Sequence, residues 1–186
     1  MYPASCSLNN RKTPKQTGTI LMSEFEVQVD AVLARVAGIL TARNWRMVTA
    51  ESCTGGWIAK CCTDVAGSSA WFDRAYVTYS YRAKEQMLGV SHDDLVKYGA
   101  VSEEIAWQMA TGARQHSKAA VVVSATGIAG PGGGMPGKPV GLVHFGWCID
   151  DQPAVCDERV FEGDRNSVRQ QTVLHALQGI ISRIDA

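Results

Sequence analysis

The sequence predicts an α/β fold in which a mixed, mostly parallel β-sheet lies between two layers of helices. Short apolar segments alternate along the chain with segments of helical periodicity, as expected for a sheet covered by helices. Residues 119–125 form a nearly continuous apolar run, which is typical of a strand buried on both faces. Two later apolar segments, residues 140–149 and 154–161, flank a turn at residues 150–153 and predict an antiparallel hairpin. We therefore expect a three-layer α/β/α sandwich with at least one antiparallel strand.

The first part of this alternation contains one leading helix and two predicted strands. Ser23 can cap the leading helix. The apolar face of that helix consists of Phe25, Val29, Val32, Leu33, Val36 and Leu40. Residues 46–50 are predicted as a strand, followed by a turn at Ser52 and a helix through about residue 65. Residues 76–80 are predicted as the next strand.

The second part is predicted to supply four more helices around the central strand and the hairpin. Helical patterns cover residues 83–88, 92–97 and 102–116, and Ser102 fits the cap of the third. The last helix is predicted to begin near Asp164. Its apolar side consists of Val173, Leu177, Ile180, Ile181 and Ile184. This helix would close the core.

Length and composition favour one soluble domain with no extended charged surface. The chain has 186 residues, of which 46% are hydrophobic, enough for a single core. It has 18 basic and 18 acidic side chains, so no overall positive field recruits nucleic acid or an anionic membrane. No apolar run approaches the roughly 18–20 residues that span a bilayer, and no signal-peptide core is present. We expect a cytoplasmic protein with a disordered tail at residues 1–21 and one domain at residues 22–186.

The cysteines and histidines show no metal-site or disulfide pattern. Six cysteines lack a repeated pair spacing, so we interpret them as reduced thiols. The four histidines have no partners at metal-ligand spacing; His92 and His116 are expected at the surface, His175 in a helix and His144 in a strand. We expect neither a metal nor a cofactor.

The turn that contains Ser52 is the first candidate site. An apolar strand runs into Glu51, Ser52, Cys53, Thr54, Gly55 and Gly56 and then into a helix. Glycines allow a ligand to approach the backbone, and N–H groups at a helix start favour a phosphate or a developing oxyanion. Two other interpretations stay open: Ser52 and Thr54 could simply cap the helix, or Cys53 could be the nucleophile if the helix start lowers its pKa.

Two further segments supply matching chemistry. Tyr79 ends a predicted strand and Lys84 follows one short turn later. A lysine in a dry pocket can be neutral and can accept the proton of a serine hydroxyl. Thr126 ends the central strand and opens a loop with five glycines, including Gly127 and Gly130, which suits an anionic ligand. Because ligands bind at the carboxyl ends of parallel strands, these hydroxyls could converge on one small molecule, although strand ends are often polar without any such role.

These three segments resemble the CinA C-terminal domain family, whose stand-alone members include nicotinamide mononucleotide (NMN) amidohydrolases, or NMN deamidases, of the PncC type. The resemblance extends from about Phe25 to Ile184 and depends on Ala-Glu-Ser-Cys-Thr-Gly-Gly at residues 50–56 and Thr-Gly-Ile-Ala-Gly-Pro at residues 126–131. It also includes Phe-Glu-Gly-Asp-Arg at residues 161–165. The amidohydrolase form implies pyridine nucleotide recycling and a serine acyl-enzyme.

The resemblance also implies a role for each matching residue. Ser52 would attack the carboxamide carbon of NMN, Lys84 would be the base with assistance from Tyr79, and ammonia would leave. The N–H groups of Cys53, Thr54 and Gly55 would bind the oxyanion, with Gly56 beside them. Thr126, Gly127 and Gly130 would position the nucleotide.

Two basic side chains have competing interpretations. Arg165, at the start of the last helix, could bind the phosphate or pair with Asp164 or Glu162. Lys60 competes with Lys84 for the role of base, but eight residues of helix carry it about 12 Å from the serine. An exposed Lys84 is the remaining alternative.

Departures from the family pattern are confined to details. Tyr81 and Arg82 stand where many relatives carry a small polar and an acidic residue, and residues 132–134 are unusually glycine-rich. Many CinA proteins carry a molybdopterin-binding-like domain for which this chain has no room. Two alternatives remain: a non-catalytic CinA-type binding module in competence or DNA-damage responses, and an amidase for another amide such as nicotinamide. A homodimer is expected from the tryptophans and apolar helices.

Overall fold

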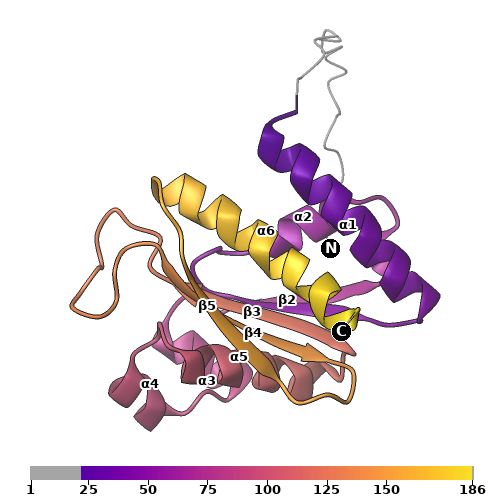
Figure 1. The fold of residues 1–186 in the computed structure, drawn as a ribbon. Coiled ribbons are helices and arrows are strands. Elements are labelled where there is room, and N and C mark those ends of the chain that lie inside the picture. Colours follow the sequence, from indigo (N-terminus) through magenta and orange to yellow (C-terminus); the bar gives the residue numbers. More distant parts are fainter. Residues whose placement is uncertain (1–21, 186) are drawn as a thin grey trace, which may run out of the picture.

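The computed structural model describes residues 22–185 as a five-stranded sheet between two layers of helices (Figure 1). The strands are β1 (Met47–Glu51), β2 (Phe72–Val77), β3 (Val121–Gly127), β4 (Leu142–Ile149) and β5 (Val155–Val160). Their order across the sheet is β2-β1-β3-β4-β5. β1 pairs in parallel with β2 and β3, whereas β4 is antiparallel to both β3 and β5. β5 therefore runs in the same direction as the first three strands, and the predicted mixed, mostly parallel sheet is confirmed.

The helices divide between the two faces of the sheet (Figure 1). One layer contains α1 (Glu24–Ala42), α2 (Trp57–Asp64) and α6 (Arg165–Ile184). The other contains α3 (Tyr81–Leu88), α4 (His92–Tyr98) and α5 (Glu103–Ser117). A short 3-10 helix, η1 (Ser68–Ala70), precedes β2. Ser23 caps α1 as predicted, and it forms a capping box in which Ser23 and Glu26 satisfy each other's backbone N–H groups.

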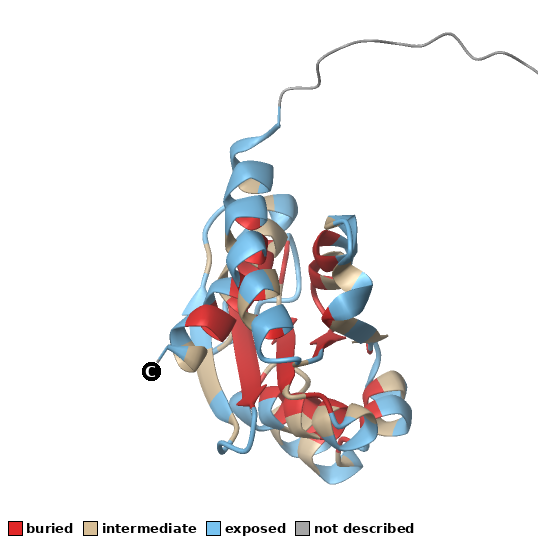
Figure 2. Cartoon of the chain, turned by 90° about the vertical axis from the view of Figure 1, so that its right-hand side faces the viewer, coloured by how far each residue is buried: buried red, intermediate tan, exposed pale blue. Residues whose placement is uncertain are grey.

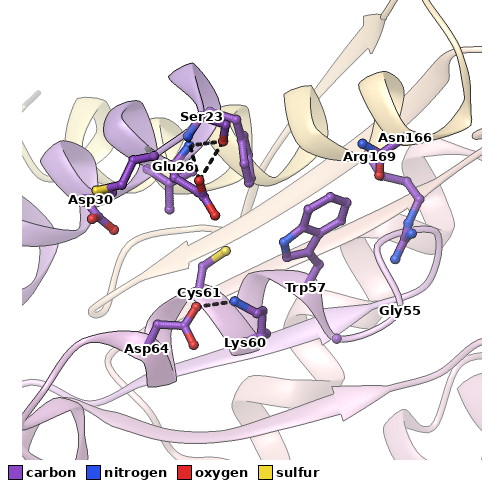
Figure 3. A pocket seen from close by; sticks show the side chains of 14 residues that line it. Ser23, Glu26, Asp30, Gly55, Trp57, Lys60, Cys61, Asp64, Asn166 and Arg169 are labelled. Carbon is purple, nitrogen blue, oxygen red and sulfur yellow. Dashed lines mark hydrogen bonds and ion pairs between the residues drawn. The ribbon is translucent and has the colours of Figure 1, made fainter. Parts of the chain in front are cut away.

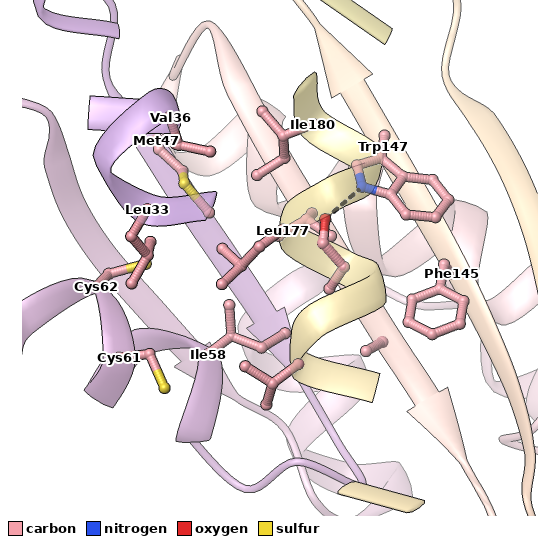
Figure 4. Close-up of a cluster of buried hydrophobic side chains, with 14 of the residues drawn as sticks. Leu33, Val36, Met47, Ile58, Cys61, Cys62, Phe145, Trp147, Leu177 and Ile180 are labelled. Atoms are coloured by element: carbon pink, nitrogen blue, oxygen red, sulfur yellow. Dashed lines mark hydrogen bonds between the residues drawn. The ribbon is translucent and has the colours of Figure 1, made fainter. Parts of the chain in front are cut away.

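The two faces of the sheet have separate apolar cores because side chains alternate along each strand. Val121 and Val123 of β3 face α1, α2 and α6, whereas Val122 between them faces α5. Figure 2 shows the buried strands between helices whose outer surfaces are exposed. On the first face, Leu33, Ile58 and Leu177 come from three different helices and meet over the sheet (Figure 4). The sandwich architecture is therefore fixed by burial on both faces.

α6 packs especially closely against β4. The indole nitrogen of Trp147 donates to the carbonyl oxygen of Ala176 at 3.0 Å (Figure 4). A Cβ atom at Gly179 would come within 2.4 Å of the same indole ring. Glycine at residue 179 therefore allows the helix to lie directly on the tryptophan, and a larger side chain would push the two apart.

One predicted strand is misplaced by the sequence pattern. Residues 76–80 were expected as a strand, but β2 spans Phe72–Val77, and Tyr79 lies in the loop that follows. The chain leaves the sheet because the hydroxyl of Ser80 accepts the N–H of Ala83 at 3.1 Å and caps α3. The remaining strands and helices agree with the prediction to within a few residues. The predicted tail at residues 1–21 lies outside the described residues.

No helix within residues 22–185 is long and apolar enough to cross a membrane.

Candidate active site

Three strand ends converge on a small cavity at the carboxyl edge of the parallel strands. Ser52 follows β1, Tyr79 lies two residues beyond β2, and Thr126 is the penultimate residue of β3. All three line one cavity of about 170 Å³. Its other lining residues are Cys53, Ala100, Val101, Gly127, Ala129 and Arg165. The three residues therefore meet at one cavity, as expected, although Tyr79 reaches it from the loop after β2 and not from a strand end.

Ser52 and Lys84 form the central contact of this site. The ammonium nitrogen Nζ of Lys84 lies 2.8 Å from Ser52 Oγ and 2.6 Å from the carbonyl oxygen of Thr78. Lys84 is completely buried and Ser52 is 8% exposed, so little water competes for these bonds. The alternative of an exposed Lys84 is therefore wrong. α3 brings the lysine to the serine because Ser80 caps its first turn and fixes its direction.

The environment of Lys84 favours its neutral form. Burial lowers the pKa of the Lys84 amine from 10.5 to about 8, because the charged form loses its hydration. The positioning bonds come from a hydroxyl and a carbonyl, and no ion pair between described residues involves this lysine. An amine with this pKa is partly neutral near physiological pH and can accept a proton from the hydroxyl that it touches.

Cys53 has the opposite character. Its thiol is buried, and burial raises the pKa of Cys53 to about 12. The thiol is therefore protonated at neutral pH and cannot act as a thiolate nucleophile. The five cysteines at residues 53, 61, 62, 148 and 156 are free thiols, as predicted. Cys6 lies outside the described residues.

The start of α2 differs from the sequence expectation. The buried carboxylate of Glu51 accepts the N–H groups of Gly56 (2.9 Å), Ile58 (3.1 Å) and Ala59 (2.9 Å). It also accepts the hydroxyls of Thr49 (3.0 Å) and Thr54 (2.7 Å). The helix start was expected to bind a ligand anion or to be capped by Ser52 or Thr54, but Glu51 occupies it. Negative charge at the helix start is thus supplied by the protein itself.

The turn after Ser52 keeps two N–H groups available. Gly55 N–H donates to the carbonyl oxygen of Ser52 at 3.1 Å. Within the described part of the chain, the N–H groups of Cys53 and Thr54 have no oxygen acceptor and lie beside the thiol sulfur of Cys53, which is a weak acceptor. The carbonyl oxygens of these same two residues accept Arg169, at 3.2 Å from Nε and 2.7 Å from Nη2. Of the three donors expected for an oxyanion, Gly55 is therefore already engaged.

Arg165 and Tyr79 form the mouth of the cavity together with the glycine loop. Arg165 Nη1 donates to the carbonyl oxygen of Gly130 at 2.8 Å, and its Nη2 lies 3.2 Å from the hydroxyl of Tyr79. Among residues 22–185, neither Asp164 nor Glu162 forms an ion pair with Arg165, so the expected alternative of such a pair is wrong. Instead, Asp164 caps α6 through the N–H of Ser167. Tyr79 is 63% exposed. Both side chains can therefore meet a ligand that enters from solvent.

The segment that contains Ala100 forms the far wall of the cavity and is held from several sides. The carbonyl oxygen of Ala100 accepts the buried hydroxyl of Thr126 at 2.6 Å, and the N–H of Ala100 donates to the hydroxyl of Tyr81 at 3.2 Å. Lys138, from the end of the glycine loop, donates to the carbonyl oxygen of Tyr98. Thr126 thus shapes the wall, and its hydroxyl hydrogen is already committed to Ala100.

The remaining candidates lie away from the cavity. Lys60 is paired with Asp64 on the exposed surface of α2, which agrees with its exclusion as the base. His92 pairs with Glu85 and His175 with Asp157, and no group of three metal-ligating side chains occurs in residues 22–185. The predicted surface position of His92 and the helical position of His175 are confirmed.

Sequence reasoning missed Glu51 and Arg169 as parts of this site. Glu51 ends a strand that is otherwise apolar or hydroxyl-bearing, and a carboxylate there is a signal for a buried acceptor. Arg169 lies one helical turn after Arg165, so it faces the same side of α6. No sequence spacing identified its partners, because they are backbone carbonyl oxygens more than a hundred residues away.

Comparison with known proteins places this geometry in a family. The CinA C-terminal domain matches residues 29–184. A protein of Enterobacter agglomerans named nicotinamide-nucleotide amidohydrolase PncC is 48% identical over 153 residues, covering 82% of this chain and 93% of that protein. The protein of the same name from Escherichia coli K12 is 49% identical over 144 residues, covering 77% of this chain and 87% of that one.

A solved structure extends the likeness to the fold. The crystal structure of the competence/damage inducible protein CihA from Agrobacterium tumefaciens superposes with a TM-score of 0.83 at 44% identity. The match covers 87% of this chain and 98% of that one. In sequence and in architecture, the chain belongs to the CinA C-terminal domain family.

Proposed function

We propose that this protein is a nicotinamide-nucleotide amidohydrolase that converts NMN and water to nicotinic acid mononucleotide and ammonia. Relatives that carry this name match nearly their whole length at 48–49% identity. The observation that carries the proposal is the buried contact of 2.8 Å between Lys84 Nζ and Ser52 Oγ. It pairs a nucleophile with a base of pKa about 8, which is a combination that can hydrolyse an amide through a serine.

In the proposed first step, Ser52 Oγ attacks the carboxamide carbon while neutral Lys84 accepts the hydroxyl proton. The contact distance favours Lys84 over Tyr79 as the immediate base, since the hydroxyl of Tyr79 faces Arg165. The carbonyl π electrons move to oxygen, and the N–H groups of Cys53 and Thr54 are available to bind that oxyanion. Donors of this kind typically contribute about 3–4 kcal/mol to the transition state.

Collapse of the tetrahedral intermediate breaks the carbon–nitrogen bond and leaves an acyl-enzyme on Ser52. Lys84 returns its proton to the departing nitrogen, so that ammonia leaves as a neutral molecule and the amine is neutral again. A water molecule then attacks the ester carbon while Lys84 accepts one of its protons. The ester carbon–oxygen bond breaks, Lys84 returns that proton to Ser52 Oγ, and the acid product leaves.

The size of the cavity indicates that one part of NMN lies inside it and the rest lies at its mouth. A volume of about 170 Å³ suits a pyridine carboxamide ring but not the whole nucleotide. Ala100, Val101 and Ala129 provide apolar walls for such a ring. Arg165, beside Tyr79 and the carbonyl oxygen of Gly130, would meet the phosphate at the mouth. Gly127 and Gly130 would allow the loop to approach the ribose.

We infer a role in pyridine nucleotide recycling in the cytoplasm, a catalytic domain comprising residues 22–186, and a homodimer without nucleic acid. The balanced count of 18 basic and 18 acidic side chains supports the last point. Light scattering of the purified protein, with and without residues 1–21, tests the assembly and the domain boundary.

The decisive experiment measures ammonia release from NMN by the wild type, Ser52→Ala and Cys53→Ala. We expect release by the wild type and by Cys53→Ala, because the thiol is protonated, and none by Ser52→Ala. Nicotinamide riboside and nicotinamide serve as comparison substrates, and weaker activity on both is expected if Arg165 binds the phosphate. A folded wild type that releases no ammonia would refute the proposal and favour a non-catalytic binding module.

A further inference from the structure

We propose that Arg169 is a positioning residue that orients the peptide group binding the oxyanion. This inference rests on the proposed function, because it concerns the transition state of that reaction. Arg169 lies on α6 and does not line the cavity that contains Ser52. It acts instead on the far side of the turn, through the carbonyl oxygens of Cys53 and Thr54.

The contacts of Arg169 are specific to a guanidinium group. Nε donates to the carbonyl oxygen of Cys53 at 3.2 Å, and Nη2 donates to that of Thr54 at 2.7 Å. The same group lies over the ring of Trp57, 5.0 Å from its centroid. A guanidinium has donors in a rigid planar fork, so it can bind two neighbouring carbonyl oxygens at once and fix their directions, whereas an ammonium has no such fork.

Peptide planarity connects these contacts to the active site. The carbonyl oxygen of Cys53 belongs to the same peptide group as the N–H of Thr54, and the two point in opposite directions across a trans bond. Fixing the oxygen toward α6 therefore directs the Thr54 N–H away from α6. That N–H is one of the two in the turn that have no oxygen acceptor within the described part of the chain. Arg169 thus fixes the orientation of a candidate oxyanion donor.

The neighbouring contacts hold the rest of the turn. The next peptide group has its oxygen on Arg169 Nη2 and its N–H, from Gly55, on the carbonyl oxygen of Ser52. The hydroxyl of Thr54 is bound by Glu51 at 2.7 Å. Without Arg169, Glu51 would still anchor the threonine side chain, but the carbonyl oxygen of Cys53 would lose the hydrogen bond that fixes the Cys53–Thr54 peptide. The expected effect of removing Arg169 is therefore a misdirected donor in a protein that remains folded.

A second cavity gives independent access to Arg169. It has a volume of about 700 Å³ and lies between the beginnings of α1 and α6 and one side of α2, where Arg169, Trp57 and Gly55 line one side (Figure 3). This outer cavity shares no lining residue with the cavity that contains Ser52. A small guanidinium ion from solvent can therefore reach the place of the missing side chain without entering the active site.

The test combines steady-state kinetics with chemical rescue. Arg169→Met keeps an unbranched apolar stem beside Trp57 and removes the donors. We expect kcat for ammonia release from NMN to fall by about 10- to 100-fold, somewhat less than the loss of a whole oxyanion donor, while KM changes less than about threefold. Arg43→Met is the matched control, because Arg43 also lies over an indole ring, that of Trp45 at 4.8 Å, and is remote from the site. It should leave both constants unchanged.

Rescue separates positioning from a purely structural role. In Arg169→Ala, guanidinium chloride below its denaturing range should raise kcat several-fold, whereas the same concentration of sodium chloride should not. Arg169→Lys should stay closer to Arg169→Met than to the wild type, because it lacks the fork. Wild-type kcat in folded Arg169→Met, or a loss confined to KM, would overturn the inference. If the wild type itself releases no ammonia, the proposed function fails and the inference fails with it, which is a distinct result.

Discussion

Replacing Lys84 by methionine should abolish activity and at the same time stabilise the protein at neutral pH. The amine is completely buried, and its pKa falls from 10.5 to about 8. A depression of ~2.5 pKa units corresponds to ~3 kcal/mol of destabilisation at pH 7, because each unit is worth about 1.4 kcal/mol. Loss of the two hydrogen bonds to Ser52 and Thr78 offsets about 2 kcal/mol of the gain. The net expectation is a variant more stable by about 1 kcal/mol.

The pH dependence of this difference provides a sharper test than its size. Between the folded pKa of about 8 and the unfolded value of 10.5, the unfolded chain binds more protons than the native protein at Lys84. The stability of the wild type therefore rises with pH across this window, and the destabilisation is largely gone near pH 10. The variant has no group to titrate there. Its advantage should shrink and reverse, leaving it less stable than the wild type by roughly 1 kcal/mol at about pH 10.

Urea unfolding followed by tryptophan fluorescence at about pH 7 and pH 10 measures both free energies of unfolding. Effects of other titrating groups cancel in the difference between the two proteins. Lys60→Met is a suitable control, since Lys60 is exposed and paired with Asp64 at the surface. Two results would refute the conclusion that the Lys84 amine is buried and largely desolvated. One is a Lys84→Met variant less stable than the wild type at pH 7; the other is a stability difference between the two proteins that does not change with pH.

Three further predictions follow from the contacts of the site. The kcat/KM of the wild type should increase with pH and level off above about 8, because the neutral form of Lys84 is active; an activity that decreases over this range would exclude it as the base. Glu51→Gln should lower the free energy of unfolding by about 2–4 kcal/mol in urea titrations, because the NH₂ group of the glutamine would face backbone N–H groups of α2 that now bind a carboxylate. An unchanged urea midpoint would contradict this. Tyr81→Phe should raise KM for NMN by about 5-fold with little change in kcat, since the Ala100 N–H loses its acceptor at a cost of about 1 kcal/mol; an equal KM would show that the hydroxyl of Tyr81 does not position the cavity wall.

The fold could be predicted from the sequence because buried faces of strands and helices require apolar residues at regular spacings along the chain. The apolar run of β3 and the capped helices α1 and α5 all occur where the pattern placed them. β2 was displaced because the exposure of its residues is mixed, so its sequence shows no clean alternation. β2 lies at the edge of the sheet, where only one neighbouring strand pairs with it. Edge strands therefore show less of the apolar pattern that identifies a buried strand.

The site was predictable to the extent that its residues follow strand ends. Ser52 and Thr126 were located in this way, and Lys84 by its distance from Tyr79 along the chain. Glu51 and Arg169 were not located, because both act on backbone groups, and any residue type supplies such groups. The sequence does not record which N–H or carbonyl group is free, so contacts of this kind become visible only with the fold.

The charge of the cavity mouth has a consequence for the rate of substrate encounter. Arg165 contacts a phenol and a carbonyl oxygen rather than a carboxylate, so its positive charge is not cancelled by a bound partner. The chain as a whole is neutral, with 18 basic and 18 acidic side chains, and produces little field beyond about 8 Å in physiological salt. A phosphorylated substrate would thus be captured by contact with one arginine and not drawn in from a distance, and its association rate would depend only weakly on ionic strength.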